Sequence, residues 1–208
     1  MRRIRWAALG IGLLTGTLIA GRLAYASDTV SFNVPSVSGE CPVSWTKTGV
    51  TFQATVPGRT PSSFTLEGGT GTVDVAGDPI ALALDPAKLS DAVALTVNLT
   101  SGFTLSDGKG NVVELSGGQA KAPTGGLTYL VRHPADPSGV RMAALDYPLP
   151  AKLNPMLVST LPVELTMDAT TDLTITPEFA KVLNDAFGTG SASGGQTFGS
   201  CTGHAATA

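Results

Sequence analysis

The sequence is poor in the residue types that most often carry catalysis. Its 208 residues include two cysteines, two histidines and two tryptophans. His133 and His204 are the only histidine bases available to a nucleophilic hydrolase, and no Gly-x-Ser-x-Gly elbow is present. Cys41 and Cys201, with only His204 nearby in sequence, make a poor zinc site. We therefore expect no catalytic and no metal-binding residues.

Carboxylates are the one catalytic residue type present in number. A pair of them can hydrolyse a glycoside when the fold holds the two together. Most of those found here stand beside turn residues or at outward positions of expected strands, as solvated acids do. The sequence therefore favours a protein that is not an enzyme, with a secreted hydrolase as a third hypothesis. The acidic candidates are Asp74, Asp78, Asp146, Glu164, Asp168 and Asp172.

The first 26 residues have the order of a secretory signal peptide. Arginines at positions 2, 3 and 5 precede an apolar stretch over residues 6–20, and Ala24-Tyr25-Ala26 provides a cleavage site before Ser27. The alternative is an uncleaved anchor, but the apolar stretch is shorter than the roughly 20 residues that a spanning helix needs. No later stretch is long enough to span a bilayer. We expect a product that is secreted or held at the cell surface.

Removal of the signal makes the chain more acidic. The full sequence has a formal net charge of −3, and residues 1–26 contain four arginines and no acid, so the remainder carries −7. An acidic surface repels phosphate backbones and anionic headgroups. Nucleic acid is therefore excluded as an expected partner, whereas neutral ligands, cations and proteins remain open.

Two cysteines near the ends of the mature chain predict one disulfide. An exported protein meets an oxidising environment, in which Cys41 and Cys201 would normally join. The alternatives are two free thiols or a shared metal site.

Alternating apolar and polar residues predict a mainly β protein. A period of two is typical of a strand with one buried face, and turn residues separate the segments. We predict an antiparallel β-sandwich or barrel with one short C-terminal helix, forming a single domain over residues 27–202 with a disordered tail at 203–208. The expected strands are 30–34, 50–56, 63–66, 72–75, 80–84, 93–99, 103–105, 112–115, 127–132, 140–145, 163–167, 172–175 and 196–202.

One turn is clear from its residues. Asp107-Gly108 supplies the backbone angles of a tight hairpin and should join strands 103–105 and 112–115. Asp107, Lys109 and Asn111 also have the spacing of a calcium loop. However, Lys109 replaces an oxygen ligand, and Gly118 stands where the bidentate acid would be. A hairpin is the favoured interpretation.

The predicted C-terminal helix has both of its end signals. Thr176 can cap the start, Pro177 suits the first helical position, and Gly188 can end the helix. Apolar residues recur between them at helical spacing. A shorter helical turn is expected from Asp85 to Leu89, where Asp-Pro again provides a start.

Residues 173–188 and 195–199 resemble the ending of exported β domains of high-GC Gram-positive bacteria, among them the HtaA-type domains associated with haem uptake. The resemblance implies a β module of the cell envelope that binds haem through a tyrosine supported by a histidine. Tyr129 with His133, and Tyr147, are the candidate ligands. The alternative interpretation is a buried aromatic residue and a loop histidine.

These observations lead to two main hypotheses. The first is an exported, non-enzymatic β domain that binds a protein or small ligand or contributes to the cell envelope. The second is a carrier of haem or another small ligand. A deep apolar pocket around Tyr129, His133 or Tyr147 would favour the carrier, and a fully packed interior would favour the first hypothesis.

Overall fold

The computed structural model describes residues 29–58, 62–66, 69–82, 84–123, 125–147, 152–160 and 163–208. The predicted signal peptide and its cleavage site lie outside these residues. Within them, no helix is both long and apolar enough to cross a membrane.

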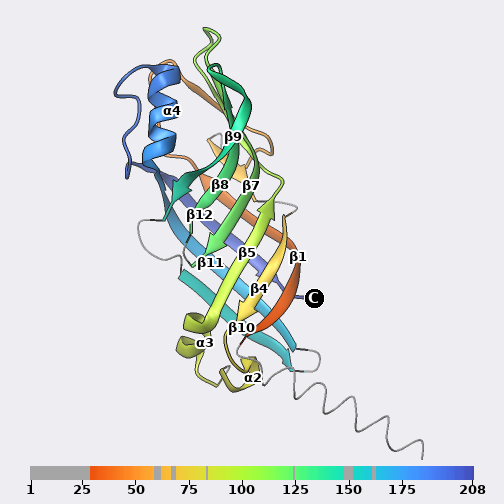
Figure 1. Cartoon of the computed structure of the whole chain (residues 1–208). Coiled ribbons are helices and arrows are strands. Elements are labelled where there is room, and N and C mark those ends of the chain that lie inside the picture. The colour runs from red at the N-terminus through yellow and green to blue at the C-terminus, as the bar shows by residue number, and fades with distance from the viewer. Residues whose placement is uncertain are drawn as a thin grey trace, which may run out of the picture.

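The described chain is mainly β, as the alternating sequence predicts. Figure 1 shows an elongated molecule with α4 at one end and α2 and α3 at the other. The strands are β1 (Val30–Pro42), β2 (Thr51–Ala54), β3 (Ser63–Thr65), β4 (Gly69–Val75), β5 (Val93–Leu99), β6 (Phe103–Ser106), β7 (Val112–Ala122), β8 (Leu127–His133), β9 (Asp136–Asp146), β10 (Lys152–Thr160), β11 (Val163–Ile175) and β12 (Thr197–Ala206). The helices are α2 (Pro79–Leu82), α3 (Pro86–Ala92) and α4 (Pro177–Phe187).

All strands belong to one antiparallel sheet that closes on itself. Its order is β2-β6-β7-β5-β4-β1-β12-β11-β9-β8, and β8 also pairs with β7. β10 is added at the edge of β11, and β3 is added at the edge of β1. The closed order confirms the predicted mainly β fold with a short C-terminal helix.

Strand alternation places one face of each strand inside. In β5 every second residue, from Val93 to Leu99, is buried, while Ala94 and Asn98 are exposed. Aromatic rings fill the interior toward α4: the ring centroids of Phe64 and Phe198 each lie 5.3 Å from that of Phe103. These contacts form the core against which the helix packs.

The predicted helix α4 is present with its predicted caps. The Thr176 hydroxyl accepts a hydrogen bond from the Phe179 backbone N–H at 3.2 Å and donates one to the Ala143 carbonyl at 2.7 Å. Gly188 ends the helix with φ 93°, a conformation that favours glycine. The Thr176 side chain therefore caps α4 and also ties it to β9.

The predicted disulfide and hairpin are confirmed. Cys41 on β1 and Cys201 on β12 form a disulfide between adjacent strands, 160 residues apart in sequence. The hairpin joins β6 to β7, with Ser106 opposite Val112. In its turn the Asp107 carboxylate accepts hydrogen bonds from the backbone N–H groups of Lys109 and Asn111, at 2.8 and 3.2 Å.

Two local predictions are wrong. Residues 80–84 were expected to form a strand, but α2 occupies Pro79–Leu82. The Asp78 carboxylate accepts from the Ile80 N–H at 2.9 Å, so an Asp-Pro start selects a helical turn that the alternation of Ala and Leu does not reveal.

The expected disordered tail is instead part of β12. This strand continues to Ala206 because β1 and β11 flank it on both sides. The Thr207 N–H then donates to the Leu165 carbonyl, and the Leu165 N–H donates to the Thr207 hydroxyl, both at 2.9 Å. Two neighbouring strands supply these hydrogen bonds, which a reading of local composition cannot detect.

Candidate functional site

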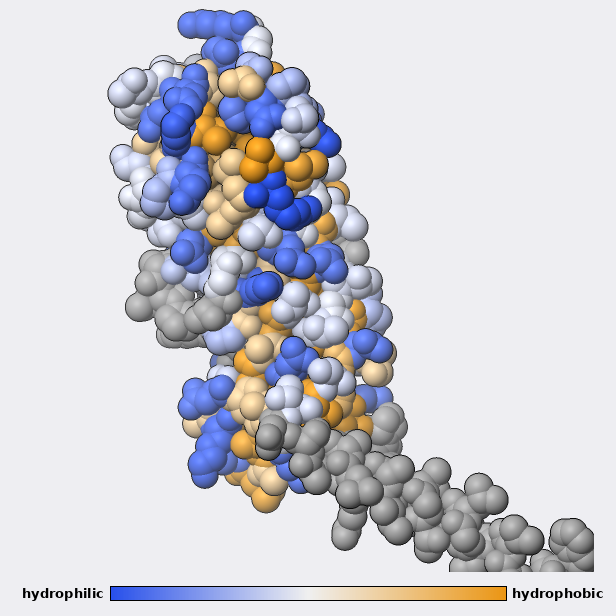
Figure 2. Space-filling view, in the orientation of Figure 1, coloured by the Kyte–Doolittle hydropathy of each residue, from blue (hydrophilic) through white to orange (hydrophobic). Residues whose placement is uncertain are grey.

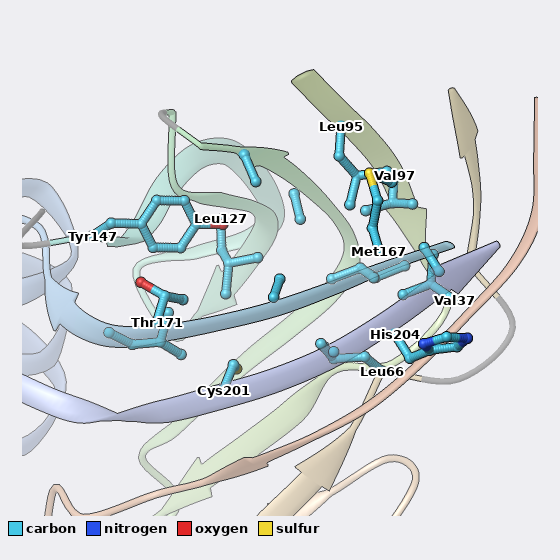
Figure 3. Close-up of a pocket in the computed structure, with 17 residues that line it drawn as sticks. Val37, Leu66, Leu95, Val97, Leu127, Tyr147, Met167, Thr171, Cys201 and His204 are labelled. Atoms are coloured by element: carbon cyan, nitrogen blue, oxygen red, sulfur yellow. The ribbon is translucent and has the colours of Figure 1, made fainter. Parts of the chain in front are cut away.

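An apolar cavity of about 70 Å³ lies inside the closed sheet. One wall is formed by inward residues of β5 and β7, and the other by inward residues of β11 and β12. Figure 3 shows the lining side chains, most of which are aliphatic, with Tyr147 and Thr171 at one end. The sequence did not predict this cavity, because its walls come from strands far apart along the chain.

Small side chains leave the space unfilled. Ala120 and Ala122 line the cavity from β7, and Ala169, Gly203 and Ala205 line it from the opposite wall. Protein interiors are close-packed and contain few voids larger than a water molecule. Small side chains on facing strands therefore leave an apolar space between the two walls.

The hydrogen-bonded wall is interrupted beside the cavity. β11 pairs with β10 through Thr170 and with β9 from Thr174 onward. Thr171 lies between these two ladders, and among the described residues its strand partner is Cys201 of β12. Tyr147 follows directly after β9 at the same place. Among the described residues, Thr171 and Tyr147 therefore mark the end of the cavity at which the two ladders meet.

Tyr147 brings a hydroxyl group to this end of the cavity. Burial raises the pKa of Tyr147 to about 12, and the charge of neighbouring Asp146 adds to the shift. Its ring extends into the cavity in Figure 3. At neutral pH the phenol therefore carries its proton and can donate a hydrogen bond to a ligand.

Tyr129 lies in the packed interior, where the charge of Tyr147 still acts on it. It is fully buried and contacts Phe103 edge to face, with ring centroids 6.0 Å apart. Burial, and secondarily the charge of Tyr147, raises the pKa of Tyr129. Its hydroxyl has no hydrogen-bond partner among the described residues. A Cβ at Gly118 would lie 2.6 Å from its Cε1 atom, so glycine makes room for this ring.

The third candidate, His133, lies apart from the tyrosine pair. It ends β8 and pairs with Asp136 at the turn into β9. Four residues along a strand separate it from Tyr129, which corresponds to roughly 13 Å. His133 does not line the cavity. The register of Leu127 opposite Leu145 places Tyr147 about as far from Tyr129 along the strands as His133, in the opposite direction. The fold therefore places Tyr129 in the core, Tyr147 at the cavity and His133 at the hairpin.

His204, which its sequence position places in the expected tail, instead contacts a carboxylate of the neighbouring strand. His204 Nδ1 lies 2.9 Å from Asp168 Oδ1 on the outer face of β12 and β11. Ser38 of β1 lies opposite His204 on the other side of β12. The described residues contain no group of three or more His, Cys, Asp or Glu able to hold a metal ion.

The end of the molecule with α2 and α3 exposes apolar side chains. Ile80, Leu84, Met156 and Val158 are exposed there, around the two helices and β10. Figure 2 shows hydrophobic surface at this end. This patch is open to solvent, whereas the cavity is flanked by sheet on both sides and has hydroxyl groups at one end. The cavity is therefore the better candidate site.

Comparisons with known proteins support the fold. No family model matches the chain, and no curated protein matches it. The crystal structure of the C-terminal domain of HtaA from Corynebacterium glutamicum is similar, with a TM-score of 0.50 and 13% sequence identity, covering 85% of this chain and 99% of that domain. A domain-swapped dimer of a variant of that domain matches with a TM-score of 0.37 and 11% identity, covering 100% of this chain and 97% of that one. The predicted resemblance to HtaA-type domains is thus confirmed for the fold.

Proposed function

We propose that this chain is an exported, non-enzymatic domain of the cell envelope that binds a small apolar ligand in the cavity between β5–β7 and β11–β12. The cavity carries the proposal, because an apolar hollow with a few convergent polar groups is the usual form of a ligand site. The disulfide fits an oxidising compartment outside the cytoplasm. Likeness of fold to a domain of HtaA supports an envelope role.

Haem carriage is the second candidate function. The position of Tyr147 at the cavity favours it, because a tyrosine can ligate haem iron. Tyr147 would be the ligand, since its ring faces the cavity while Tyr129 is fully buried. The volume weighs against this function: 70 Å³ is about half of the 150 Å³ apolar cavity that accepts benzene, and haem is far larger. Haem would require the two walls to separate.

Cavity filling tests the proposed function. Methyl groups of Val97, Leu99 and Met167 line the cavity, so their NMR signals should shift on titration with small apolar species such as butane and xenon. Ala122→Trp should abolish the shifts by filling the space. The matched control is Ala94→Trp, which adds the same ring on the outer face of the neighbouring strand β5.

Three outcomes are informative. Saturable shifts that are lost in Ala122→Trp and kept in Ala94→Trp would support the proposal. Because Ala122→Trp can disturb folding, Ala169→Leu provides a milder block of the opposite wall. An absence of shifts with every compound would overturn ligand binding at this cavity. A haemin titration with a Soret shift lost in Tyr147→Ala would instead establish the haem carrier.

A further inference from the structure

We infer that the cavity takes a single unbranched aliphatic chain whose neutral head group hydrogen-bonds to Tyr147 and Thr171. This inference rests on the proposed function and specifies its ligand class. Three properties of the cavity carry it: its size and aliphatic walls, the hydroxyl groups at one end, and the charges around that end.

Size and wall chemistry favour a chain over a ring. A cavity of about 70 Å³ is about half the size of one that accepts benzene, so it suits a narrow chain of only a few methylene groups better than a ring. The facing walls present aliphatic side chains, among them Leu95, Val97 and Leu99 from β5. Tyr147 is the only Phe, Tyr or Trp in the described lining, so a planar ligand would find little to stack on.

The end of the cavity beside Tyr147 suits a polar head group. The Thr171 hydroxyl donates to the Asp172 carbonyl at 3.1 Å, which leaves its oxygen free to accept from a ligand. The phenol of Tyr147 stays protonated at neutral pH and can donate. Figure 3 shows both residues at the same end of the cavity. An alcohol or ester oxygen could use both groups at once.

Charges at this end favour a neutral head group over a carboxylate. No lysine or arginine belongs to the described lining, so an anion would have no counter-ion. Asp146 directly precedes Tyr147, and its negative charge contributes to the raised pKa of that tyrosine, so an acid already acts on this end of the cavity. Lys121 lies between Ala120 and Ala122 but is exposed on the opposite face of β7. His204 lines the opposite end of the cavity, and its ring lies against Asp168 on the outer face of the sheet. A buried, unpaired carboxylate would be costly there.

A ligand whose head lies at Tyr147 would place its tail toward Met167 and Val97, which line the same cavity.

Four small probes test the inference on the oxidised mature domain: 1-butanol, butyrate, butane and benzene. Dissociation constants would be measured at pH 7.5 from methyl NMR shifts. We expect 1-butanol to bind about tenfold more tightly than butyrate, because the acid must lose its charge or its hydration. Tyr147→Phe should weaken 1-butanol binding about tenfold through the lost hydrogen bond and leave butane unchanged.

The outcomes separate this inference from the proposed function. The neutral-head inference would be overturned if 1-butanol and butyrate bound equally well. It would also be overturned if Tyr147→Phe bound 1-butanol as tightly as the parent does. In either case ligand binding at the cavity would stand. Binding of benzene or haemin without the chain compounds would overturn the chain inference alone. No binding of any probe would overturn the proposed function itself. Tyr147→Phe keeps the ring in place, so a loss of fold is not the expected cause of a change.

Discussion

Tyr129 and Tyr147 lie close enough in the interior for charge on Tyr147 to raise the pKa of Tyr129. One ring is packed in the aromatic core against Phe103, and the other lines the apolar cavity. Tyr129 therefore belongs to the aromatic core, and Tyr147 belongs to the wall of the cavity. A probe of tyrosine ionisation reports on both.

Tyrosine titration should be delayed in the folded protein. Because burial raises the pKa of Tyr147 to about 12 and that of Tyr129 as well, the domain without residues 1–26, and hence without Tyr25, should show no tyrosinate absorbance at 295 nm near pH 10 while the fold persists. A raised folded pKa means that this contribution to stability is complete below the unfolded pKa of about 10 and is lost as pH rises toward 12. Unfolding in urea should restore ordinary titration. A tyrosine that ionises near pH 10 with native circular dichroism would contradict the buried placement.

Loss of the Cys41–Cys201 disulfide should strongly destabilise the domain. The bond closes a loop with a sequence separation of 160, for which chain entropy predicts about 5 kcal/mol. Urea unfolding of the Cys41→Ser/Cys201→Ser double variant measures the loss. These are the only two cysteines in the chain, so a reducing agent should reproduce the effect in the parent and have none in the variant. Equal stability of oxidised and reduced parent would contradict the prediction.

Thr176 should stabilise α4 through its hydroxyl. Thr176→Ala removes the cap to the Phe179 N–H and leaves the Ala143 carbonyl without this donor, so we expect a loss of about 1–2 kcal/mol in the free energy of unfolding. Chemical denaturation measures it. Thr176→Ser keeps the hydroxyl and is the matched control. Equal destabilisation by Ala and Ser would show that the methyl group, rather than the cap, matters.

The carboxyl of Asp107 should titrate below its ordinary range. Hydrogen bonds from the Asn111 side chain, and then from the Lys109 backbone, lower the pKa of Asp107 below 3.8. A lowered folded pKa means that the turn is stabilised above the unfolded pKa and loses this stabilisation as pH falls through the folded pKa. Carboxyl NMR should show the pKa rising toward 3.8 in Asn111→Ala.

Asp136 provides an internal control for that titration. Its pKa is also lowered, chiefly by the Ser138 hydroxyl, in a different hairpin. Asn111→Ala should leave the Asp136 titration unchanged. A shift of both carboxyls would indicate a general change in the fold instead of a lost local hydrogen bond.

Much of the local structure followed from the sequence alone. Alternation predicted β5, the Asp107-Gly108 turn predicted the β6–β7 hairpin, and Thr176 with Gly188 predicted both ends of α4. These signals are local, because strand period, turn angles and helix caps depend on a few neighbouring residues. Compartment and cysteine count also sufficed for the disulfide, since two cysteines allow one pairing.

The cavity was decided by tertiary structure. Ala122, Ala169 and Gly203 face one another because ring closure brings β7, β11 and β12 together, and nothing in a local pattern of small residues says what lies across from it. The same long-range contacts extended β12 through His204 and placed Tyr147, rather than His133, at the cavity. Alternation records which face of a strand is buried. Only the packing of strands distant in sequence determines whether that buried face meets another side chain or an open space.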